Sequence, residues 1–327
     1  MGDRTVGPPP QEDSASAGPE YRYTAFGLVV SSCIRCPELF DAAGRPDVTV
    51  KYGAVSTEYA TPIHAGGLRS KATPGKLTLE VDQIARFLVR DGTDIVIDRH
   101  GDANDDDVRL FLLGSSFGAL LHQRGVLVLH GSTIRVGDGC VVFLGRRGAG
   151  KSTLAAALAR RGYVRLGDDV CAISIGEDGV PYAAPAYPQA KLWLDSLEHL
   201  GLDATTLRRV RPTREKRAVP FEGDPSQNPL PVKGLYVLSP SKDRTDIAIG
   251  PIRGPIKIRA LRDYTYRLQF LKGFDLARHH FAQITHVASR LPMIRVMRPA
   301  HGALMEQVAM AVERDLRSSI GSGDQAP

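Results

Sequence analysis

Nine consecutive residues near the middle of the chain limit its fold more than any other feature. The first eight of them match the pattern G-x-x-x-x-G-K-[ST] in full, which is the pattern of a loop that binds phosphate groups. The residues are Gly145, Arg146, Arg147, Gly148, Ala149, Gly150, Lys151, Ser152 and Thr153. The apolar run 140–144 precedes the loop as a strand would, and the helix-forming run 154–159 follows it. The sequence therefore predicts a strand, a phosphate loop and a helix in succession.

The residue types in the loop suit a bound nucleotide. Glycines let the backbone wrap until successive N–H groups converge on an anion, and the helix N-terminus adds the positive end of its dipole. We expect Lys151 to reach the β- and γ-phosphates and the Ser152 hydroxyl to ligate Mg²⁺. ATP and Mg²⁺ are thus the expected cofactors, and an ordinary glycine-rich turn is the alternative.

The composition is that of a folded globular protein. Of the 327 residues, 43% are hydrophobic and 24% are charged, which allows two domains of ordinary size. No apolar run approaches the ~20 residues that span a bilayer, and the first 18 residues lack the apolar core of a signal peptide. We therefore expect a cytoplasmic protein without a membrane partner.

The net charge of +6 is compatible with ATP, an acidic peptide or nucleic acid. Basic residues crowd two stretches, 208–217 and 253–267. Aromatic residues of the kind that stack on nucleobases are absent from the first stretch and few in the second, so no nucleic-acid partner is expected. Either both stretches are ordinary solvated surfaces, or the first steers an acidic peptide towards the protein.

Turn and strand signals predict four parts of the chain. Residues 1–20 form a disordered leader, 21–109 a β-rich N-terminal domain, 110–317 the phosphate-loop domain and 318–327 a disordered tail. The expected elements include a strand over 23–31, a helix or strand over 83–89, a helix over 108–124, a strand over 256–261 and a last helix over 302–317.

Cys33 and Cys36 form a C-x-x-C pair, but no second Cys or His pair lies nearby to complete a zinc site. Pro37 follows directly, where a redox-active pair would begin a helix. Neither a metal site nor redox chemistry is expected of this pair.

Two adjacent carboxylates, Asp168 and Asp169, follow the strand predicted after the loop's helix. Ligands of α/β sheets collect at the carboxyl ends of the strands, so we expect both side chains near a bound γ-phosphate. One can hold Mg²⁺ while the other accepts a proton from an attacking hydroxyl. The alternative is the strand end of an NTPase that transfers no phosphoryl group to an acceptor.

Three motifs follow one another along the chain: His130-Gly131, the phosphate loop and Asp168-Asp169. In this order they resemble the motifs of the catalytic domain of bacterial HPr kinase/phosphorylase and its relatives. The resemblance covers about residues 126–175. It implies an α/β fold in which a phosphate-loop kinase domain of HPr-kinase type joins a β-rich N-terminal domain.

Carried over by position, the resemblance also implies roles for single residues. Asp168 would be the general base towards a serine hydroxyl, and His130 would pair with it. Asp169 and Ser152 would lie on the metal side, and Lys151 would clamp the phosphates. A basic residue from a later loop completes the site in that family, and the candidates here are Arg217 and Lys216.

The chain also departs from the HPr enzyme. It lacks that family's Glu-containing signature with a Gly-Leu-Gly core, which puts reversal of the phosphorylation and hexamer assembly in doubt; a homo-oligomer stays open. Shorter stretches, including Tyr187–Trp193, resemble a related subgroup found with peptide-modifying systems. That subgroup includes kinases that phosphorylate the C-terminal serine of lasso-peptide precursors. Tyr187 and Trp193 either pack in the core or form a wall of the site.

The leading expectation is a kinase that uses ATP and Mg²⁺ to phosphorylate a serine hydroxyl of a peptide or small protein, with a lasso-type precursor peptide first. A small-molecule hydroxyl, such as that of free serine, comes next, because the chemistry of the site would be the same. The competing class is a regulator that binds the nucleotide without transferring its phosphate.

Overall fold

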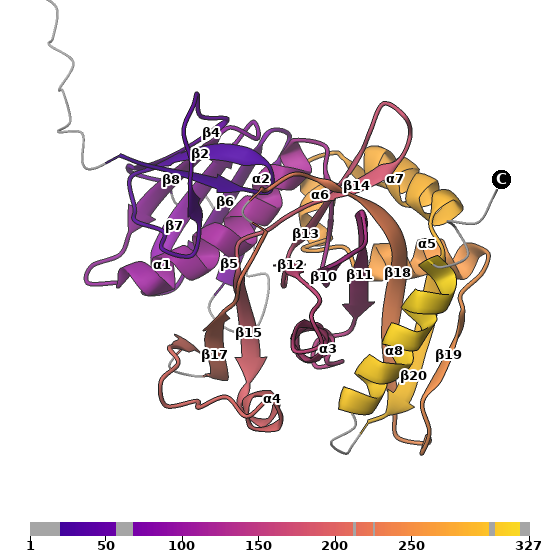
Figure 1. Ribbon diagram of the computed structural model, residues 1–327. Helices are drawn as coiled ribbons and strands as arrows, with labels where there is room; N and C mark the ends of the chain where they lie inside the picture. Colours follow the sequence, from indigo (N-terminus) through magenta and orange to yellow (C-terminus); the bar gives the residue numbers. More distant parts are fainter. Residues whose placement is uncertain (1–19, 57–67, 212–213, 225, 301–304, 321–327) are drawn as a thin grey trace, which may run out of the picture.

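The computed structural model describes residues 20–56, 68–211, 214–224, 226–300 and 305–320 (Figure 1). Three predicted segments lie outside these residues: almost all of the leader, the part 321–327 of the tail and the start of the last helix. Two large sheets and one small sheet form the frame, with helices packed around the second large sheet. The protein is therefore of the mixed α/β class.

The N-terminal part of the chain forms the first sheet, at the upper left of Figure 1. Its eight strands lie in the order β3-β1-β2-β4-β8-β7-β6-β5, mostly antiparallel, with β4 parallel to β2 and β8. The strands are β1 Tyr21–Ala25, β2 Leu28–Ser32, β3 Phe40–Asp41, β4 Val48–Tyr52, β5 Leu68–Thr73, β6 Lys76–Val81, β7 Ala85–Arg90 and β8 Asp94–Arg99. Of the two alternatives for 83–89, the structure contains the strand.

The single strand predicted over 23–31 is wrong. The chain turns at Phe26 and Gly27, whose φ angles are +56° and +74°, so β1 and β2 form a hairpin. A non-glycine residue seldom adopts a positive φ, but the buried Phe26 ring packs against Phe117 and Tyr187 and so holds the turn. Apolar residues continue through the hairpin, and the sequence pattern therefore hides the turn.

A helical segment crosses from the first sheet to the second. It consists of α1 Asp105–Phe111, the π-helical turn η1 Leu112–Ser116 and α2 Phe117–Gln123, which confirms the helix predicted over 108–124. Phe111, Phe117 and Leu120 share one core with strands of the first sheet. The segment thus packs on the sheet that precedes it in the sequence.

The second sheet carries the phosphate loop. Seven strands lie in the order β12-β10-β11-β18-β14-β13-β9, and β20 pairs with β18 while β19 pairs with β20. Strands β11, β18 and β20 are mutually parallel. The strands are β9 Leu127–Leu129, β10 Gly131–Val136, β11 Gly139–Gly145, β12 Arg165–Gly167, β13 Cys171–Ile175, β14 Pro181–Ala184, β18 Leu230–Ser241, β19 Ala248–Pro251 and β20 Met293–Pro299.

Helices cover both faces of this sheet, which explains the unbroken apolar run before the loop. Val141 and Phe143 of β11 belong to the core shared with α3 and α8, while Cys140, Val142 and Leu144 belong to the core shared with α5 and α7. The helices that cover it are α3 Lys151–Ala159, α5 Pro255–Asp263, α7 Ala277–Arg290 and α8 Met305–Ile320. Two further helices, α4 Leu194–His199 and α6 Gln269–Gly273, belong to other cores. Among the described residues, no helix has the length and apolar character needed to cross a lipid bilayer.

The strand predicted over 256–261 is wrong, because this stretch lies in helix α5. Pro255 occupies the first turn, where its fixed φ suits a helix start and its missing N–H leaves no bond unmade. Ile256 and Ile258 suggested a strand through their alternation. In the helix, however, Leu261 is buried against the second sheet's core and Ile256 is exposed.

A third, small sheet lies at the lower left of Figure 1, where β15 and β17 are labelled. It contains β15 Gln189–Trp193, β16 Arg209–Arg211 and β17 Arg214–Pro220, in the order β15-β17-β16. All three strands come from parts of the sequence for which no strand was predicted. Side chains of this sheet form one wall of the candidate site.

Candidate functional site

The phosphate loop joins the end of β11 to the start of α3. Gly145, Gly148 and Gly150 have φ angles of +155°, +81° and +96°, conformations that side chains disfavour. The Lys151 side chain is buried and its Nζ donates to the carbonyl of Gly145 at 3.0 Å. Burial lowers the pKa of Lys151, and the nearby charges of Asp168 and Asp169 oppose that effect.

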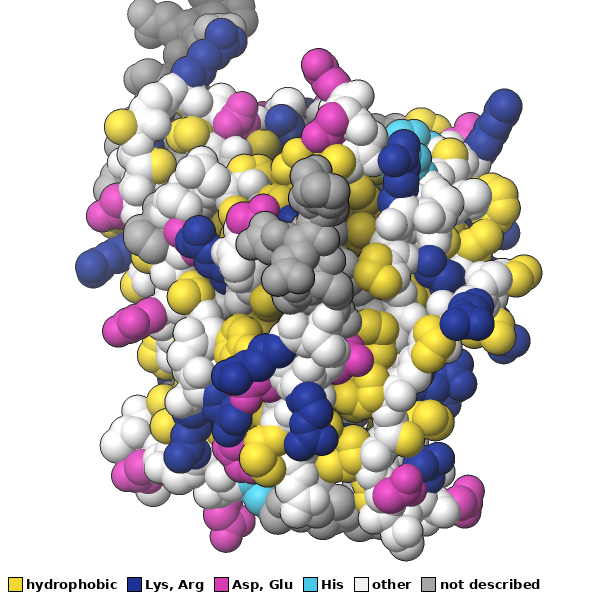
Figure 2. All heavy atoms as spheres, turned by 45° about the vertical axis from the view of Figure 1, so that its right-hand side comes forward, with side chains coloured by type: hydrophobic (Ala, Val, Ile, Leu, Met, Phe, Trp, Pro, Cys, Tyr) yellow, Lys and Arg dark blue, Asp and Glu magenta, His cyan; other side chains and the backbone are white. Residues whose placement is uncertain are grey.

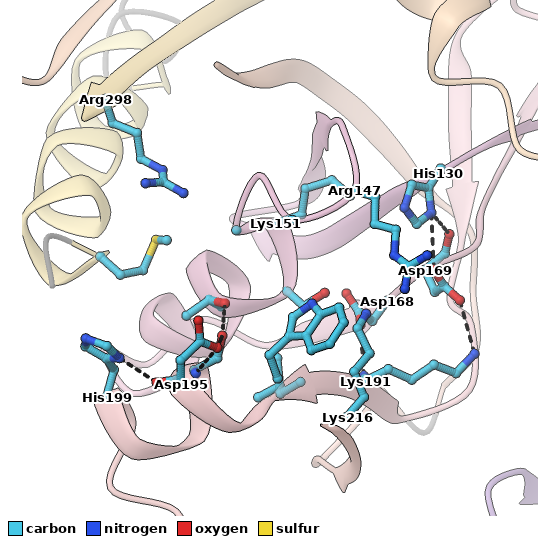
Figure 3. Close-up of a pocket in the computed structure, with 18 of the residues that line it drawn as sticks. His130, Arg147, Lys151, Asp168, Asp169, Lys191, Asp195, His199, Lys216 and Arg298 are labelled. Atoms are coloured by element: carbon cyan, nitrogen blue, oxygen red, sulfur yellow. Dashed lines mark hydrogen bonds and ion pairs between the residues drawn. The ribbon is translucent and has the colours of Figure 1, made fainter. Parts of the chain in front are cut away.

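A cavity of about 480 Å³ opens over this loop (Figure 3). Six residues of the predicted loop line it: Arg147, Gly148, Gly150, Lys151, Ser152 and Thr153. Arg147 also lines a second cavity. Gly145 and Arg146 line only the second cavity, and Ala149 is buried in the core. Arg298 from β20 also lines the first cavity, and its Nη2 donates to the carbonyl of Ala149 in the loop at 2.9 Å (Figure 3).

Asp168 follows β12 and is almost fully buried. The Ser132 hydroxyl donates to its Oδ1 at 2.5 Å, and the backbone N–H of Lys191 donates to its Oδ2 at 3.3 Å. Both partners are neutral groups. The carboxylate is thus held in place within the cavity that contains Lys151 and Ser152.

Asp169 has a different environment from its neighbour. Its φ is +72°, unusual for a residue other than glycine, and its Oδ1 and Oδ2 lie 3.2 Å from His130 Nδ1 and 3.1 Å from Lys191 Nζ. Burial by itself raises the pKa of Asp169, but Lys191 and His130 outweigh it and hold that pKa well below its usual range. The side chain is therefore a permanently charged anion at neutral pH.

The predicted pairing of His130 with Asp168 is wrong, because His130 pairs with Asp169. Its Nδ1 also lies 3.0 Å from the Asp169 carbonyl oxygen. The left-handed turn at Asp169 directs the two adjacent carboxylates to different neighbours (Figure 3). Adjacency in the sequence therefore did not indicate which carboxylate the imidazole would reach.

Arg217 does not lie in the cavity, although it was the first candidate for the late basic residue. Its Nε donates to the Ala204 carbonyl at 3.1 Å, and the side chain is buried on the other face of β17. Lys216 lines the cavity instead, with Nζ 5.0 Å from the centre of the Trp193 ring. Successive residues of a strand point to opposite faces, so only one of the two could reach the site.

The two aromatic residues of the stretch Tyr187–Trp193 also lie in different environments. Tyr187 is buried in the core against Phe26, which is the first of its two predicted alternatives. Trp193 lines the cavity, which is the second alternative, and the guanidinium of Arg147 and the ammonium of Lys216 lie 5.8 Å and 5.0 Å from the centre of its ring.

Sequence reasoning missed Lys191 and the role of Ser132. On β15, Ala190 and Leu192 pack in a small core, while Lys191 and Trp193 lie on the cavity side. The alternation in Gln189–Trp193 was a strand signal that could have placed Lys191 beside Trp193. For Ser132 the only signal was its position two residues after His130.

A second cavity, of about 660 Å³, adjoins the first. Its wall includes the helical segment around Ser115 and the loop Tyr264–Arg267. Five residues line both cavities: His130, Arg147, Asp169, Lys191 and Lys216. The two cavities therefore meet at the partly exposed carboxylate Asp169.

The donors around the loop fit a magnesium ion bound together with a nucleotide. Among the described residues, no group of three His, Cys, Asp or Glu side chains is arranged to hold a metal without help. Mg²⁺, however, commonly takes one or two carboxylates, a hydroxyl and the phosphate oxygens of its nucleotide. Ser152, Asp168 and Asp169 line one cavity and supply those donor types.

Cys33 and Cys36 are free thiols, half-buried and buried respectively. Burial raises the pKa of Cys33 to about 11 and that of Cys36 to about 12. Both thiols stay protonated at neutral pH, whereas metal binding and redox attack require the thiolate.

No family model matches the chain, and no curated protein matches it. Among solved structures, the Hpr(Ser) kinase/phosphatase from Coxiella burnetii aligns with 59% of this chain and 98% of that chain, at 14% sequence identity and a TM-score of 0.29. A TM-score this low supports no conclusion about activity. The function proposed below therefore rests on the residues of the site.

Proposed function

We propose that the protein is a kinase that transfers the γ-phosphoryl group of ATP to a hydroxyl group with the help of Mg²⁺. The observation that carries the proposal is the buried carboxylate of Asp168 in the cavity of the phosphate loop, beside Lys151. A protein that only binds a nucleotide needs the loop and one carboxylate for Mg²⁺, and Asp169 can supply that carboxylate. The second carboxylate in the cavity, Asp168, is then available to accept a proton from a hydroxyl.

The loop and the carboxylate pair divide the work of binding. The backbone N–H groups of the loop and Lys151 hold the phosphates. Ser152 and Asp169 would hold Mg²⁺, which neutralises charge on the phosphate oxygens when bound. Lys216 from β17 and Arg147 from the loop itself stabilise the negative charge of the phosphoryl group during transfer.

Asp168 is the better placed of the two carboxylates to accept a proton. Its hydrogen-bond partners are a hydroxyl and an amide, whereas both oxygens of Asp169 contact cationic or basic groups that lower its proton affinity. In the transfer, the acceptor O–H gives its proton to Asp168 and the oxygen bonds to the γ-phosphorus. The bond from that phosphorus to the β,γ-bridging oxygen breaks, and ADP leaves.

For the acceptor we propose a serine hydroxyl of a peptide or small protein, with the C-terminal serine of a lasso-type precursor peptide as the first to test. Free serine is the second, because the same site chemistry would act on it. The support is the motif order His130-Gly131, phosphate loop, Asp168-Asp169 and the open cavity beside Asp169.

Intact-mass spectrometry tests the proposal. The protein is incubated with ATP, Mg²⁺ and, separately, a serine-ending precursor peptide, an HPr-like protein and free serine. We expect one acceptor to gain one phosphate, about 80 Da. Asp168→Asn should lower the transfer rate by about 10²- to 10⁴-fold with ATP affinity nearly unchanged, since it removes only the proton acceptor. Lys151→Ala should weaken ATP binding as well.

Asp138→Asn is the matched control, because it makes the same chemical change at an exposed ion pair with Lys233. It should leave transfer intact. If ATP binds but no acceptor gains mass, or if Asp168→Asn transfers as fast as the unchanged protein, the kinase proposal fails and a nucleotide-binding regulator takes its place.

A further inference from the structure

The second cavity has the size of a ligand site and borders the reacting groups. Its volume of about 660 Å³ lies within the range of about 300–1,000 Å³ that is typical of small-ligand pockets. Leu68 from the first sheet, Leu110 and Phe111 from α1, and Tyr264 and Tyr266 from the loop after α5 give it apolar walls. It joins the nucleotide cavity at Asp169.

Cations dominate the charged residues of this cavity. Its positive side chains are Arg146, Arg147, Lys191, Lys216 and Arg267, and its carboxylates are Asp169 and Asp263. Lys191 is already paired with Asp169. The lining therefore carries a net positive charge, which favours an anionic occupant.

Arg267 lines the second cavity and not the first, and the structure holds it in a defined position. Its Nη2 donates to the Ser115 hydroxyl of η1 at 2.9 Å, and its guanidinium lies 5.8 Å from the centre of the Tyr266 ring. Its φ is +51°, a left-handed conformation. Because an Arg side chain has five N–H donors, the bond to Ser115 leaves others for a carboxylate.

The wall that carries Arg267 is firmly attached to the protein. The Tyr266 N–H donates to the Val128 carbonyl at 2.9 Å, and His122 Nε2 lies 2.8 Å from the Tyr266 carbonyl oxygen. A side chain on Gly118 would meet the Tyr266 ring at 2.7 Å, so the ring fits closely against α2. Arg267 is thus presented by a rigid support, which lowers the entropy lost when it binds an anion.

We infer that the second cavity binds the phosphate acceptor, and that the acceptor carries a carboxylate which Arg267 holds while the hydroxyl reaches the junction of the two cavities. This inference rests on the proposed kinase function. The cavity is too small for the surface of a folded protein, so the occupant is an extended peptide end or a small hydroxy acid, which share this chemistry.

Fluorescence of the single Trp tests the inference without any phosphoryl transfer. Trp193 is the only Trp in the sequence, and it lies beside Lys216, which lines both cavities. Trp-free peptides ending in serine are titrated as the free acid and as the C-terminal amide, and free serine is titrated separately. We expect the free-acid peptide to bind about tenfold or more tightly than the amide, since one charge-assisted contact is lost.

Arg267→Gln identifies the group responsible. It should weaken binding of the free acid by about tenfold or more, leave the amide nearly unchanged and so remove the difference between them. Arg267→Lys should restore part of it. The exposed Arg262→Gln is the matched control and should change nothing. Thermal unfolding of each variant shows whether it has kept its fold.

The inference is overturned if acid and amide bind alike, if Arg267→Gln weakens both equally, or if no carboxylate-bearing acceptor binds. If free serine binds more tightly than the peptide, the small hydroxy acid is the occupant. That result would overturn the peptide end as occupant but not the carboxylate site. Transfer from ATP that does not depend on Arg267 would leave the kinase function standing without this inference. A carboxylate preference that depends on Arg267 but comes without any transfer would support the carboxylate site and overturn the occupant's role as phosphate acceptor.

Discussion

At the scale of single residues, two adjacent carboxylates differ because of what surrounds each of them. Asp168 is held by a hydroxyl and an amide, and Asp169 by His130 and Lys191. The positive φ of Asp169 is the kind of backbone strain that proteins retain at functional sites. The division of tasks between them thus follows from their partners, since their residue type is the same.

His122 shows how a residue outside the site supports it and makes stability depend on pH. It is buried and its Nε2 donates to the Tyr266 carbonyl at 2.8 Å. Burial lowers the pKa of His122 to about 4. In the unfolded chain it would bind a proton near pH 6.5, so the unfolded state binds more protons between pH 6.5 and about 4.

We therefore expect a contribution to the free energy of unfolding that is complete above pH 6.5 and is lost as the pH falls towards 4, by about 3 kcal/mol in total. His122→Gln removes this titration. Urea unfolding of both proteins at pH 7.5 and pH 5 measures it: the unchanged protein should lose more stability between the two values. Parallel losses would show that His122 is not held neutral.

At the scale of elements, strand alternation and helix packing decide which side chains meet. Strand β15 places Lys191 and Trp193 towards the cavity, and its partner β17 does the same for Lys216. Helix α2 approaches the loop after α5 closely enough that only glycine fits at position 118. Both cavities thus depend on the packing of elements that are far apart in the sequence.

Gly118→Ala tests the fit between α2 and this loop. Its Cβ would lie 2.7 Å from two carbons of the Tyr266 ring, so the ring must shift. We expect a loss of about 1–3 kcal/mol, even though Ala is the better helix former. Gly114→Ala is the matched control, because its Cβ would make an ordinary contact at 3.5 Å. Equal stability of the two variants, measured by urea unfolding, would contradict the close fit.

At the scale of the whole molecule, the two large sheets share a core. One apolar cluster contains residues of the first sheet, residues of the helical segment 105–123, and Val128 of β9 and Ala172 of β13 from the second sheet. Ion pairs add to it: Glu38 is buried and lies 3.0 Å from Arg109, and Arg208 lies within 3.7 Å of the same carboxylate. Part of the basic stretch 208–217 is therefore structural. On the face of the molecule that Figure 2 shows, carboxylates are interspersed among Lys and Arg side chains.

Glu38→Gln should destabilise the protein by about 3 kcal/mol, because it leaves a buried Arg109 without one of its counter-charges. Glu215→Gln is the control, since its pair with Arg209 is exposed and should contribute less than about 1 kcal/mol. Calorimetry of the unchanged protein should show one unfolding transition because the core is shared. Two separate transitions, or equal effects of both substitutions, would contradict this picture.

The sequence by itself determined the parts of the site that are contiguous along the chain. The phosphate loop, the strand before it and the helix after it are local features, since glycine φ angles, apolar runs and helix propensity act within a few residues. The carboxylate pair after the following strand could be predicted for the same reason. Alternation failed at Phe26-Gly27 and at 256–261, where short apolar runs fit more than one element.

Only the tertiary structure decided which distant side chains complete the site. Ser132 comes from β10 of the second sheet, and Lys191 and Lys216 come from β15 and β17 of the third. Arg267 comes from the loop after α5. Whether Lys216 or Arg217 reaches the cavity depends on a strand register that is set by pairing with β15. The second cavity exists because the helical segment around Ser115, the loop Tyr264–Arg267 and the third sheet meet, and no local pattern in the sequence encodes that meeting.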